Sequence, residues 1–264
     1  MIRVENLFVT FGRGTPLEKH ALNGIDLSVE PGEFVSIIGS NGAGKSTLLS
    51  AVAGDIPVSG GRIVIDGADV TRQSTARRSA RVARVFQDPL AGSAGQLTIE
   101  ENLALAVARG QPRGLRLALT AARRDLFRER ISALGLGLEN RLHDRMALLS
   151  GGQRQAVALL MATLAKSSVL LLDEHTAALD PGMAEFVVGL TRKTVAEHGM
   201  TTLMVTHSMR QALDLGTRTV MLHEGRMVLD VKGEERAGLT VGALVAMFRR
   251  QRGEMIDDDA LLID

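Results

Sequence analysis

The fold of this 264-residue chain is decided by Gly39-Ser40-Asn41-Gly42-Ala43-Gly44-Lys45-Ser46. This octapeptide has the spacing of a phosphate-binding loop. It lies between an apolar segment, residues 34–38, and a helix-forming segment, residues 47–53. Its glycines let the backbone turn with the N–H groups facing inward, which makes a nest for anionic oxygens at a helix N-terminus. We therefore predict a strand, a loop that binds a nucleoside triphosphate, and a helix.

Individual side chains of the loop have separate expected roles. Lys45 should reach the β- and γ-phosphates as a point charge, and the Ser46 hydroxyl should ligate a Mg²⁺ ion that the phosphates also hold. The alternative is a glycine-rich turn with an incidental lysine. The remaining residues expected to contact the nucleotide are Gly39, Ser40, Asn41, Gly42, Ala43, Gly44 and Thr47.

Composition narrows the class of protein. Hydrophobic residues make up 45% and charged residues 23% of the chain, its formal net charge is +1, and it contains no cysteine. Disulfides and thiolate metal sites are thereby excluded, and no basic surface argues for a nucleic-acid partner. The longest apolar run, residues 156–165, is short of the roughly 20 residues that span a bilayer, so it predicts a buried helix. Residues 1–6 lack the apolar core of a secretory signal, and we expect a cytosolic protein.

Apolar patterning predicts an α/β chain. Strand-like text covers residues 2–11, 25–29, 34–38 and 63–65, the last after a turn at Gly60-Gly61. Helical spacing predominates over residues 98–146. Residues 169–172 and 202–205 have the character of buried parallel strands.

Two acids end the first of those buried strands. A parallel sheet binds its ligand at the carboxyl ends of its strands, which is where Asp173 and Glu174 fall. Asp173 should hold Mg²⁺, directly or through water. Glu174 points to the other side of the chain and should orient or deprotonate the water that attacks the γ-phosphate, a role worth roughly 10² to 10⁴ in rate. A solvated strand end is the alternative for an isolated pair.

A second helix start carries anion-binding character. Leu149-Ser150-Gly151-Gly152-Gln153 precedes the expected buried helix and offers free backbone N–H groups. One triphosphate does not need two such helix starts, but two chains packed head to tail would each offer one to the other chain's nucleotide.

These residues resemble the signature motif of the ATP-binding-cassette (ABC) family, which has the same sequence as residues 149–153. The other motifs of that family occur here in the family's order over the whole chain. The resemblance implies an ATPase with ATP and Mg²⁺ as ligands and a RecA-like P-loop core with an antiparallel β subdomain and a helical subdomain. It implies one domain over 1–264: a core with the β subdomain over about 1–88 and 147–245, a helical subdomain over 89–146, and a charged tail over 246–264.

The same resemblance implies roles for four further residues. Gln87 matches the glutamine loop that touches Mg²⁺ or the attacking water and faces a membrane subunit. Asp180 matches the loop that communicates across the dimer interface, although a helix-capping aspartate is the simpler reading. His207 matches the histidine that contacts the γ-phosphate. Phe11 stands where the family stacks an aromatic on adenine; a core phenylalanine, or Phe8 in its place, is the alternative.

The resemblance also implies partners. They are a second copy of the chain, membrane permease subunits and, indirectly, a substrate-binding protein, with the chain peripheral on the cytoplasmic face of the cell membrane. The sequence from Asp173 to Asp180 is similar to that of one branch of importer ATPases, which implies a small polar, amino-acid-like solute as the transported substrate. An exporter subunit, a soluble cassette unrelated to transport, a GTPase and a non-catalytic scaffold are the competing classes; the guanine-reading Asn-Lys-x-Asp motif does not occur.

Two features remain for the structure to decide. His175 replaces the proline that is usual after the catalytic glutamate, which allows the backbone more freedom and adds a titratable group beside the γ-phosphate; we expect a neutral substitution. A basic stretch is expected to form a solvated helix face. Its members are Arg72, Arg77, Arg78, Arg81 and Arg84.

Overall fold

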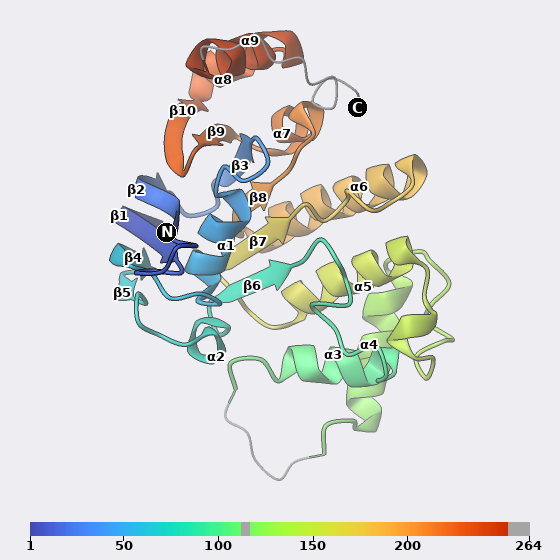
Figure 1. Ribbon diagram of the computed structural model, residues 1–264. Coiled ribbons are helices and arrows are strands. Elements are labelled where there is room, and N and C mark those ends of the chain that lie inside the picture. The colour runs from blue at the N-terminus through green and yellow to red at the C-terminus, as the bar shows by residue number, and fades with distance from the viewer. Residues whose placement is uncertain (112–116, 253–264) are drawn as a thin grey trace. The chain divides into compact units, whose positions relative to one another are not determined.

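The computed structural model describes residues 1–111 and 117–252 (Figure 1). The chain divides into two compact units. The first unit combines Met1–Thr75 with the chain from Gly199 onward, and the second unit is Ala76–His198. This division cuts the chain at other positions than the subdomain boundaries expected from the sequence, which stay a prediction. A short helix, α2 (Thr75–Arg78), stands at the junction.

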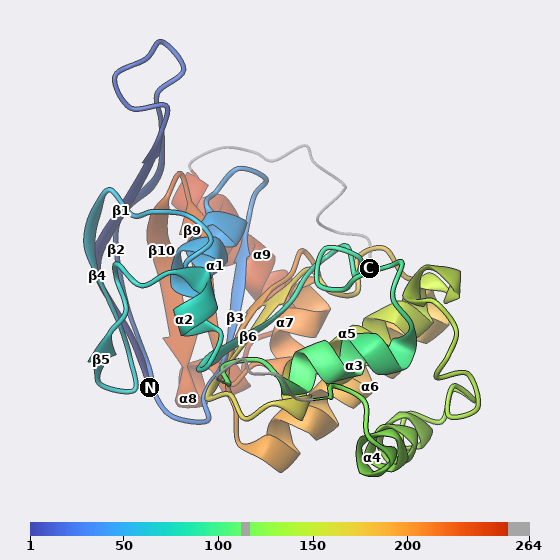
Figure 2. The same ribbon diagram turned by 90° about the horizontal axis from the view of Figure 1, so that it is seen from below.

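An antiparallel sheet forms one layer of the first unit. Its order is β2 (Lys19–Val29), β1 (Ile2–Phe11), β4 (Gly60–Ile65), β5 (Ala68–Asp69). Alternate residues of β1 are buried, as in a sheet with one covered face. In Figure 2 the hairpin of β1 and β2 projects beyond β4 and β5. The expected turn at Gly60-Gly61 is wrong, because Gly60 pairs with Phe8 and both glycines belong to β4.

A second sheet of the first unit carries the phosphate-binding loop. Its central strand β3 is buried throughout and runs parallel to β8 and β9, while β10 pairs antiparallel with β9. The helix after the loop, α1, lies between this sheet and the antiparallel one (Figure 2). The elements are β3 (Phe34–Gly39), α1 (Lys45–Ala53), β8 (Thr201–Val205), α7 (Met209–Leu215), β9 (Arg218–His223), β10 (Arg226–Lys232), α8 (Gly233–Ala237) and α9 (Val241–Arg252).

The C-terminal helix belongs to the core of this unit. Leu244 and Phe248 of α9 are buried against Ile38 of β3 and Met209 of α7. The first part of the expected charged tail, residues 246–252, therefore continues a helix. The rest of that tail, residues 253–264, lies outside the described residues.

The second unit joins a pair of parallel strands to a helical part. Val82 pairs with Val169 and Val85 with Leu172. The helical part has its own core, which includes Ile99, Phe127 and Val157, and α5 confirms the expected buried helix. The elements are β6 (Val82–Val85), α3 (Ile99–Val107), α4 (Ala121–Ser132), the 3-10 turn η1 (Met146–Leu148), α5 (Gly151–Leu164), β7 (Val169–Asp173) and α6 (Pro181–His198).

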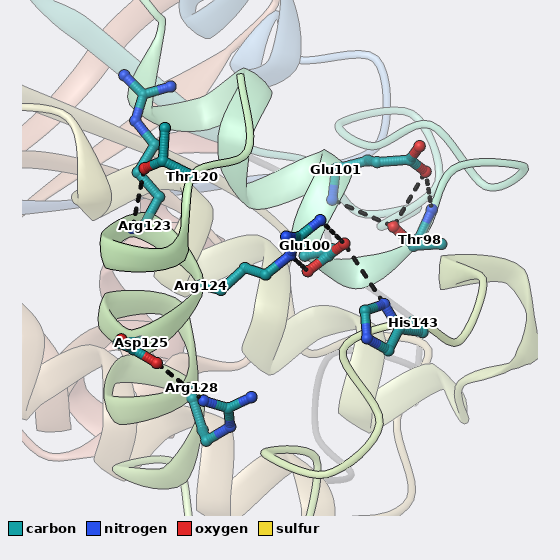
Figure 3. Close-up of polar contacts among 9 residues, drawn as sticks. All are labelled: Thr98, Glu100, Glu101, Thr120, Arg123, Arg124, Asp125, Arg128 and His143. Carbon is teal, nitrogen blue, oxygen red and sulfur yellow. Dashed lines mark hydrogen bonds and ion pairs between the residues drawn. The ribbon is translucent and has the colours of Figure 1, made fainter. Parts of the chain in front are cut away.

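Polar contacts tie the helical part together (Figure 3). Thr98 caps α3 in a reciprocal box with Glu101, because each side chain accepts the other residue's backbone N–H. The buried carboxylate of Glu100 accepts a hydrogen bond of 3.0 Å from Arg124 Nε of α4 and lies 3.4 Å from His143 Nδ1. These contacts join α3, α4 and the loop before η1. None of the described helices is long and apolar enough to cross a bilayer.

Candidate functional site

The phosphate-binding loop begins where β3 ends. Gly39 has φ +147°, and a Cβ there would stand 2.2 Å from the carbonyl oxygen of Leu222 on neighbouring β9. No other residue type fits this close approach. Gly44 then provides the N-cap of α1 with φ +101°, so the backbone turns from strand to helix within the octapeptide. The predicted order of strand, loop and helix is confirmed.

Lys45 of the loop is held in place, while Ser46 and Asn41 are exposed. Lys45 is buried, and its Nζ donates to the carbonyl oxygens of Gly39 (2.8 Å) and Ser40 (3.1 Å). The ammonium group is therefore held over the loop instead of extending into solvent. Ser46 is exposed in the first turn of α1, with Asn41 exposed at the tip of the loop.

His207 lies at the same edge of this sheet as the loop. Parallel pairing sets Ile37 beside Val205, so the chain leaves β3 toward the loop where it leaves β8 toward His207. The turn around His207 is well defined: Ser208 N–H donates to Thr206 Oγ1 at 3.1 Å, and Ser208 caps α7. The first unit thus brings together two of the predicted site elements, which lie about 160 residues apart in the sequence.

Phe11 ends β1, and 44% of its surface is exposed. The alternative of a core phenylalanine is therefore wrong. Phe8 is also partly exposed, but its ring covers Gly24 and Gly60 of the neighbouring strands. Phe11 is consequently the better placed of the two for stacking on a base, and that role stays a prediction.

The second unit gathers the acidic residues and the glutamine. Because β6 and β7 are parallel, with Val85 beside Leu172, their carboxyl ends meet at one edge. Gln87 follows β6 there, Asp173 is the last residue of β7, and Glu174 comes next. Glu174 has φ +44°, a left-handed conformation that non-glycine residues rarely adopt. Strained backbone of this kind concentrates at functional sites.

Two side chains that were assigned no role at the site from the sequence support this edge. Arg84 of β6 donates from Nη2 to Asp173 Oδ2 at 2.6 Å. Gln155 of α5 donates to the carbonyl oxygen of Phe86 at 3.2 Å, which holds the backbone directly before Gln87. The apolar text around Arg84, residues 82–86, is the signal that could have predicted a strand here.

The signature residues form the start of α5. Ser150 is the N-cap, its Oγ accepts from Gln153 N–H, and Gln153 Oε1 accepts from Ser150 N–H, both at 3.2 Å. Ser150 and Gly151 are exposed. A Cβ on Gly152 would stand 2.5 Å from Met183 of α6, so the glycine permits close packing of the two helices. Asp180 Oδ1 accepts from Met183 N–H at 3.1 Å, the geometry of a helix cap.

His175 is buried and does not add a titratable group at ordinary pH. Burial lowers the pKa of His175 from 6.5 to about 4, so the ring is neutral. The Thr191 hydroxyl donates to Val187 O, and it therefore accepts the proton of His175 Nε2 at 3.0 Å. The expectation that His175 adds a titratable group beside the γ-phosphate is wrong, since its neutral ring is buried and anchored to α6.

The expected solvated face of arginines is also wrong in part. Arg72 and Arg77 are exposed, but Arg78 is buried, and Arg84 is bound to Asp173. The basic stretch is therefore not a single helix face: it begins before α2 and ends within β6.

Known proteins that are similar to this chain are ATP-binding proteins of transporters. A model of the ABC transporter family matches residues 22–177. The chain is 43% identical to the tyrosine transport ATP-binding protein of Clostridioides difficile (strain R20291), over 94% of this chain and 98% of that protein. It is 37% identical to the thiamine import ATP-binding protein ThiQ of Shigella boydii serotype 4, over 84% of this chain and 90% of that protein.

Solved structures give the same result. A dimeric ATP-binding cassette in a post-hydrolysis state, bound to ADP and Pi, has a TM-score of 0.77 at 30% identity and covers 88% of this chain and 98% of its own. A dimeric bacterial ABC transporter cassette has a TM-score of 0.75 at 30% identity, with the same coverage. These similarities confirm the expected fold class.

Proposed function

This chain belongs to the ABC transporter family of ATP-binding proteins, and on that premise we propose how its residues divide the work of ATP hydrolysis. It is an ATPase subunit that energises transport through a separate permease. One observation carries the assignment of the hydrolysis residues. In the first unit the phosphate loop and His207 stand at the carboxyl edge of that unit's parallel strands, and in the second unit Gln87, Asp173 and Glu174 do the same. Parallel sheets bind their ligands at this edge.

Binding of ATP begins at the phosphate loop. Backbone N–H groups of residues 39–44 donate hydrogen bonds to the phosphate oxygens, and Lys45, already held over the loop, supplies the positive charge. Ser40, Asn41, Ala43 and Thr47 complete these contacts. Phe11 stacks its exposed ring on the base, which contributes roughly 1 to 3 kcal/mol to binding.

The expected metal donors suit Mg²⁺. Ser46 offers a hydroxyl, Asp173 a carboxylate and Gln87 an amide carbonyl, all hard oxygen ligands with no sulfur or imidazole among them. When bound with the phosphates, the ion neutralises charge on their oxygens. Asp173 is the donor whose place is best defined, because its carboxylate is buried and hydrogen-bonded.

Hydrolysis needs a positioned water. Glu174 accepts a proton from this water, or orients it, while His207 contacts the γ-phosphate and Gln87 helps to position the water. Little covalent chemistry falls to the protein, because phosphoryl transfer depends on positioning and charge. The left-handed backbone of Glu174 turns the chain directly after the strand and sets the direction of its carboxylate.

The second contribution to each site comes from a second copy of the chain. Ser150 and Gly151 are exposed at the start of a 14-residue helix, where the N–H groups and helix dipole favour an anion. We assign Ser150, Gly151, Gly152 and Gln153 to the partner copy's γ-phosphate and Asp180 to the dimer contact. Two dimeric structures of one similar cassette support this arrangement.

The transported solute is assigned from the relatives. The tyrosine transport protein is 43% identical, and the thiamine relative is an import protein by name. We propose import of a small polar solute of amino-acid type, delivered by a substrate-binding protein to the permease, with this chain peripheral on the cytoplasmic face of the membrane.

The decisive experiment uses Glu174→Gln. Removal of the base should leave ATP binding intact and stop turnover, so ATP accumulates between two chains and size-exclusion chromatography should show an ATP-dependent dimer. Glu197→Gln is the matched control, because Glu197 forms only an exposed 3.9 Å ion pair with Lys193 on α6. The control should hydrolyse ATP normally. Wild-type turnover in Glu174→Gln would show that the base is assigned wrongly.

A further inference from the structure

The ion pair between Arg84 and Asp173 brings a fixed positive charge to a carboxylate that the mechanism needs for metal. Arg84 pairs with Leu171 across the parallel strands, and Leu171 and Asp173 lie on one face of β7. A neighbouring strand is about 4.8 Å away and two residues span about 6.6 Å, so an extended arginine can reach forward to the carboxylate. Its Nη2 stands 2.6 Å from Asp173 Oδ2.

The surroundings hold this arginine in place. Both side chains are only 12% exposed. The guanidinium carbon lies 4.5 Å from the centre of the Phe86 ring, two residues further along the chain, in a cation–π contact. Arg84 Nε is buried without a hydrogen-bond partner, although a guanidinium normally satisfies its donors. The contact with Asp173 is therefore kept at the expense of another hydrogen bond.

A buried charge pair constrains what else the carboxylate can bind. The Arg84 guanidinium covers Oδ2 and orients the plane of the carboxylate, and its charge is always present at physiological pH. A divalent cation that approaches Asp173 meets this charge at short range, where shielding by water is weak. Arg84 thus affects the metal in two ways, through the orientation of Asp173 and through repulsion.

We propose that Arg84 is the positioning residue of Asp173 and competes with the divalent cation for this carboxylate, so that Arg84 limits how far Mg²⁺ tightens nucleotide binding. The proposal rests on the assignment of Asp173 as a metal ligand. It adds a residue that no part of the hydrolysis scheme uses, and it concerns an arginine that reaches the site from the strand leading to Gln87.

The test compares nucleotide affinity with and without metal. For each variant, a fluorescent non-hydrolysable ATP analogue is titrated in Mg²⁺ and in EDTA. The dissociation constant in EDTA divided by that in Mg²⁺ gives the coupling between metal and nucleotide. Arg84→Met should raise this ratio about tenfold, because loss of one adjacent charge typically changes an ionic equilibrium by about that factor. Arg84→Lys keeps the charge and should stay near wild type.

Two further variants make the result specific. Arg81→Met removes the same charge three residues earlier, outside the ion pair, and should leave the ratio unchanged. Asp173→Asn should lower the ratio. If Arg84→Met does not fold by circular dichroism, Arg84→Gln takes its place, since it keeps a hydrogen-bond donor for Oδ2 without charge, and the same rise is expected.

The outcomes distinguish the proposed role of Arg84 from the assignment of Asp173 as a metal ligand. An unchanged or lower ratio in the neutral Arg84 variant, together with a reduced ratio in Asp173→Asn, overturns the role of Arg84 and leaves the hydrolysis scheme standing. An unchanged ratio in Asp173→Asn removes Asp173 from the metal site and overturns both claims. A raised ratio in Arg81→Met equal to that of the Arg84 variant attributes the effect to general charge and also overturns the proposal.

Discussion

His175 should make the stability of the protein depend on pH. The ring is fully buried and neutral in the folded chain, because burial lowers its pKa from 6.5 to about 4. In the unfolded chain the same ring takes up a proton below pH 6.5. Between these values the unfolded state binds more protons than the folded state, so stability decreases as the pH falls. The contribution of His175 is fully present above pH 6.5 and lost by about pH 4.

The size of the effect follows from the difference between the two pKa values. One pKa unit corresponds to 1.36 kcal/mol, so the full loss is about 3 kcal/mol. Between pH 7 and pH 5, where the fold is easier to study, the loss is about 2 kcal/mol. This is a large fraction of the stability of an ordinary domain.

The assay compares wild type with His175→Gln in urea unfolding from pH 5 to pH 7.5. Glutamine cannot titrate but can still donate to the Thr191 hydroxyl, so the difference between the two proteins cancels the other titrating groups. The difference should change by about 2 kcal/mol over this range in favour of the variant at low pH. A difference that is independent of pH would refute the reasoning. NMR of labelled histidine should show that the signal lost in the variant does not titrate above pH 5.5.

Three further predictions concern binding and packing. Gly39→Ala should abolish ATP binding in equilibrium dialysis, because its Cβ would stand 2.2 Å from the Leu222 carbonyl oxygen. Asn102→Ala should lower the free energy of unfolding by about 2 to 4 kcal/mol in urea titration, since this buried amide bonds four backbone groups of the loop from Ala94 to Thr98. Phe11→Ala should weaken ATP binding by roughly 5- to 150-fold in a fluorescence titration, and Phe8→Ala by less.

Each of these three predictions would be contradicted by a specific result. Normal ATP affinity in Gly39→Ala would mean that the loop moves freely away from β9. A loss below about 0.5 kcal/mol in Asn102→Ala would mean that water replaces the amide. Equal weakening in the two phenylalanine variants would show that both act through the stability of the β1–β2 hairpin and not by stacking.

Local sequence predicted the parts of the fold that local chemistry determines. The glycines and Lys45 of the phosphate loop, the apolar strand that ends at Asp173, and the helix start at Ser150 each follow from residues adjacent in the chain. Both candidate edges follow from the rule that parallel strands offer ligands their carboxyl ends.

The features that were missed depend on distant partners. Strand β6 was not predicted because Arg84 interrupts its apolar sequence. The residue that neutralises this charge, Asp173, is 89 positions away in the chain. His175 was expected to add a titratable group beside the γ-phosphate, because nothing nearby in the sequence indicates that Thr191 of α6 would bind its ring. The left-handed backbone of Glu174 gives no local signal, since the preference for φ > 0 belongs to glycine and asparagine.

Gly152 connects two of the assigned roles through packing. Its missing side chain lets α5 approach Met183, and the N–H of Met183 is bound by Asp180, the cap of α6. The signature helix and the Asp180 loop therefore cannot shift independently, because close-packed side chains transmit displacement instead of absorbing it. If the partner copy's nucleotide binds at Ser150, its loss after hydrolysis changes the force on α5 and, through Met183, on the residue assigned to the dimer contact. Release of phosphate and opening of the dimer would then be one mechanical event within this unit.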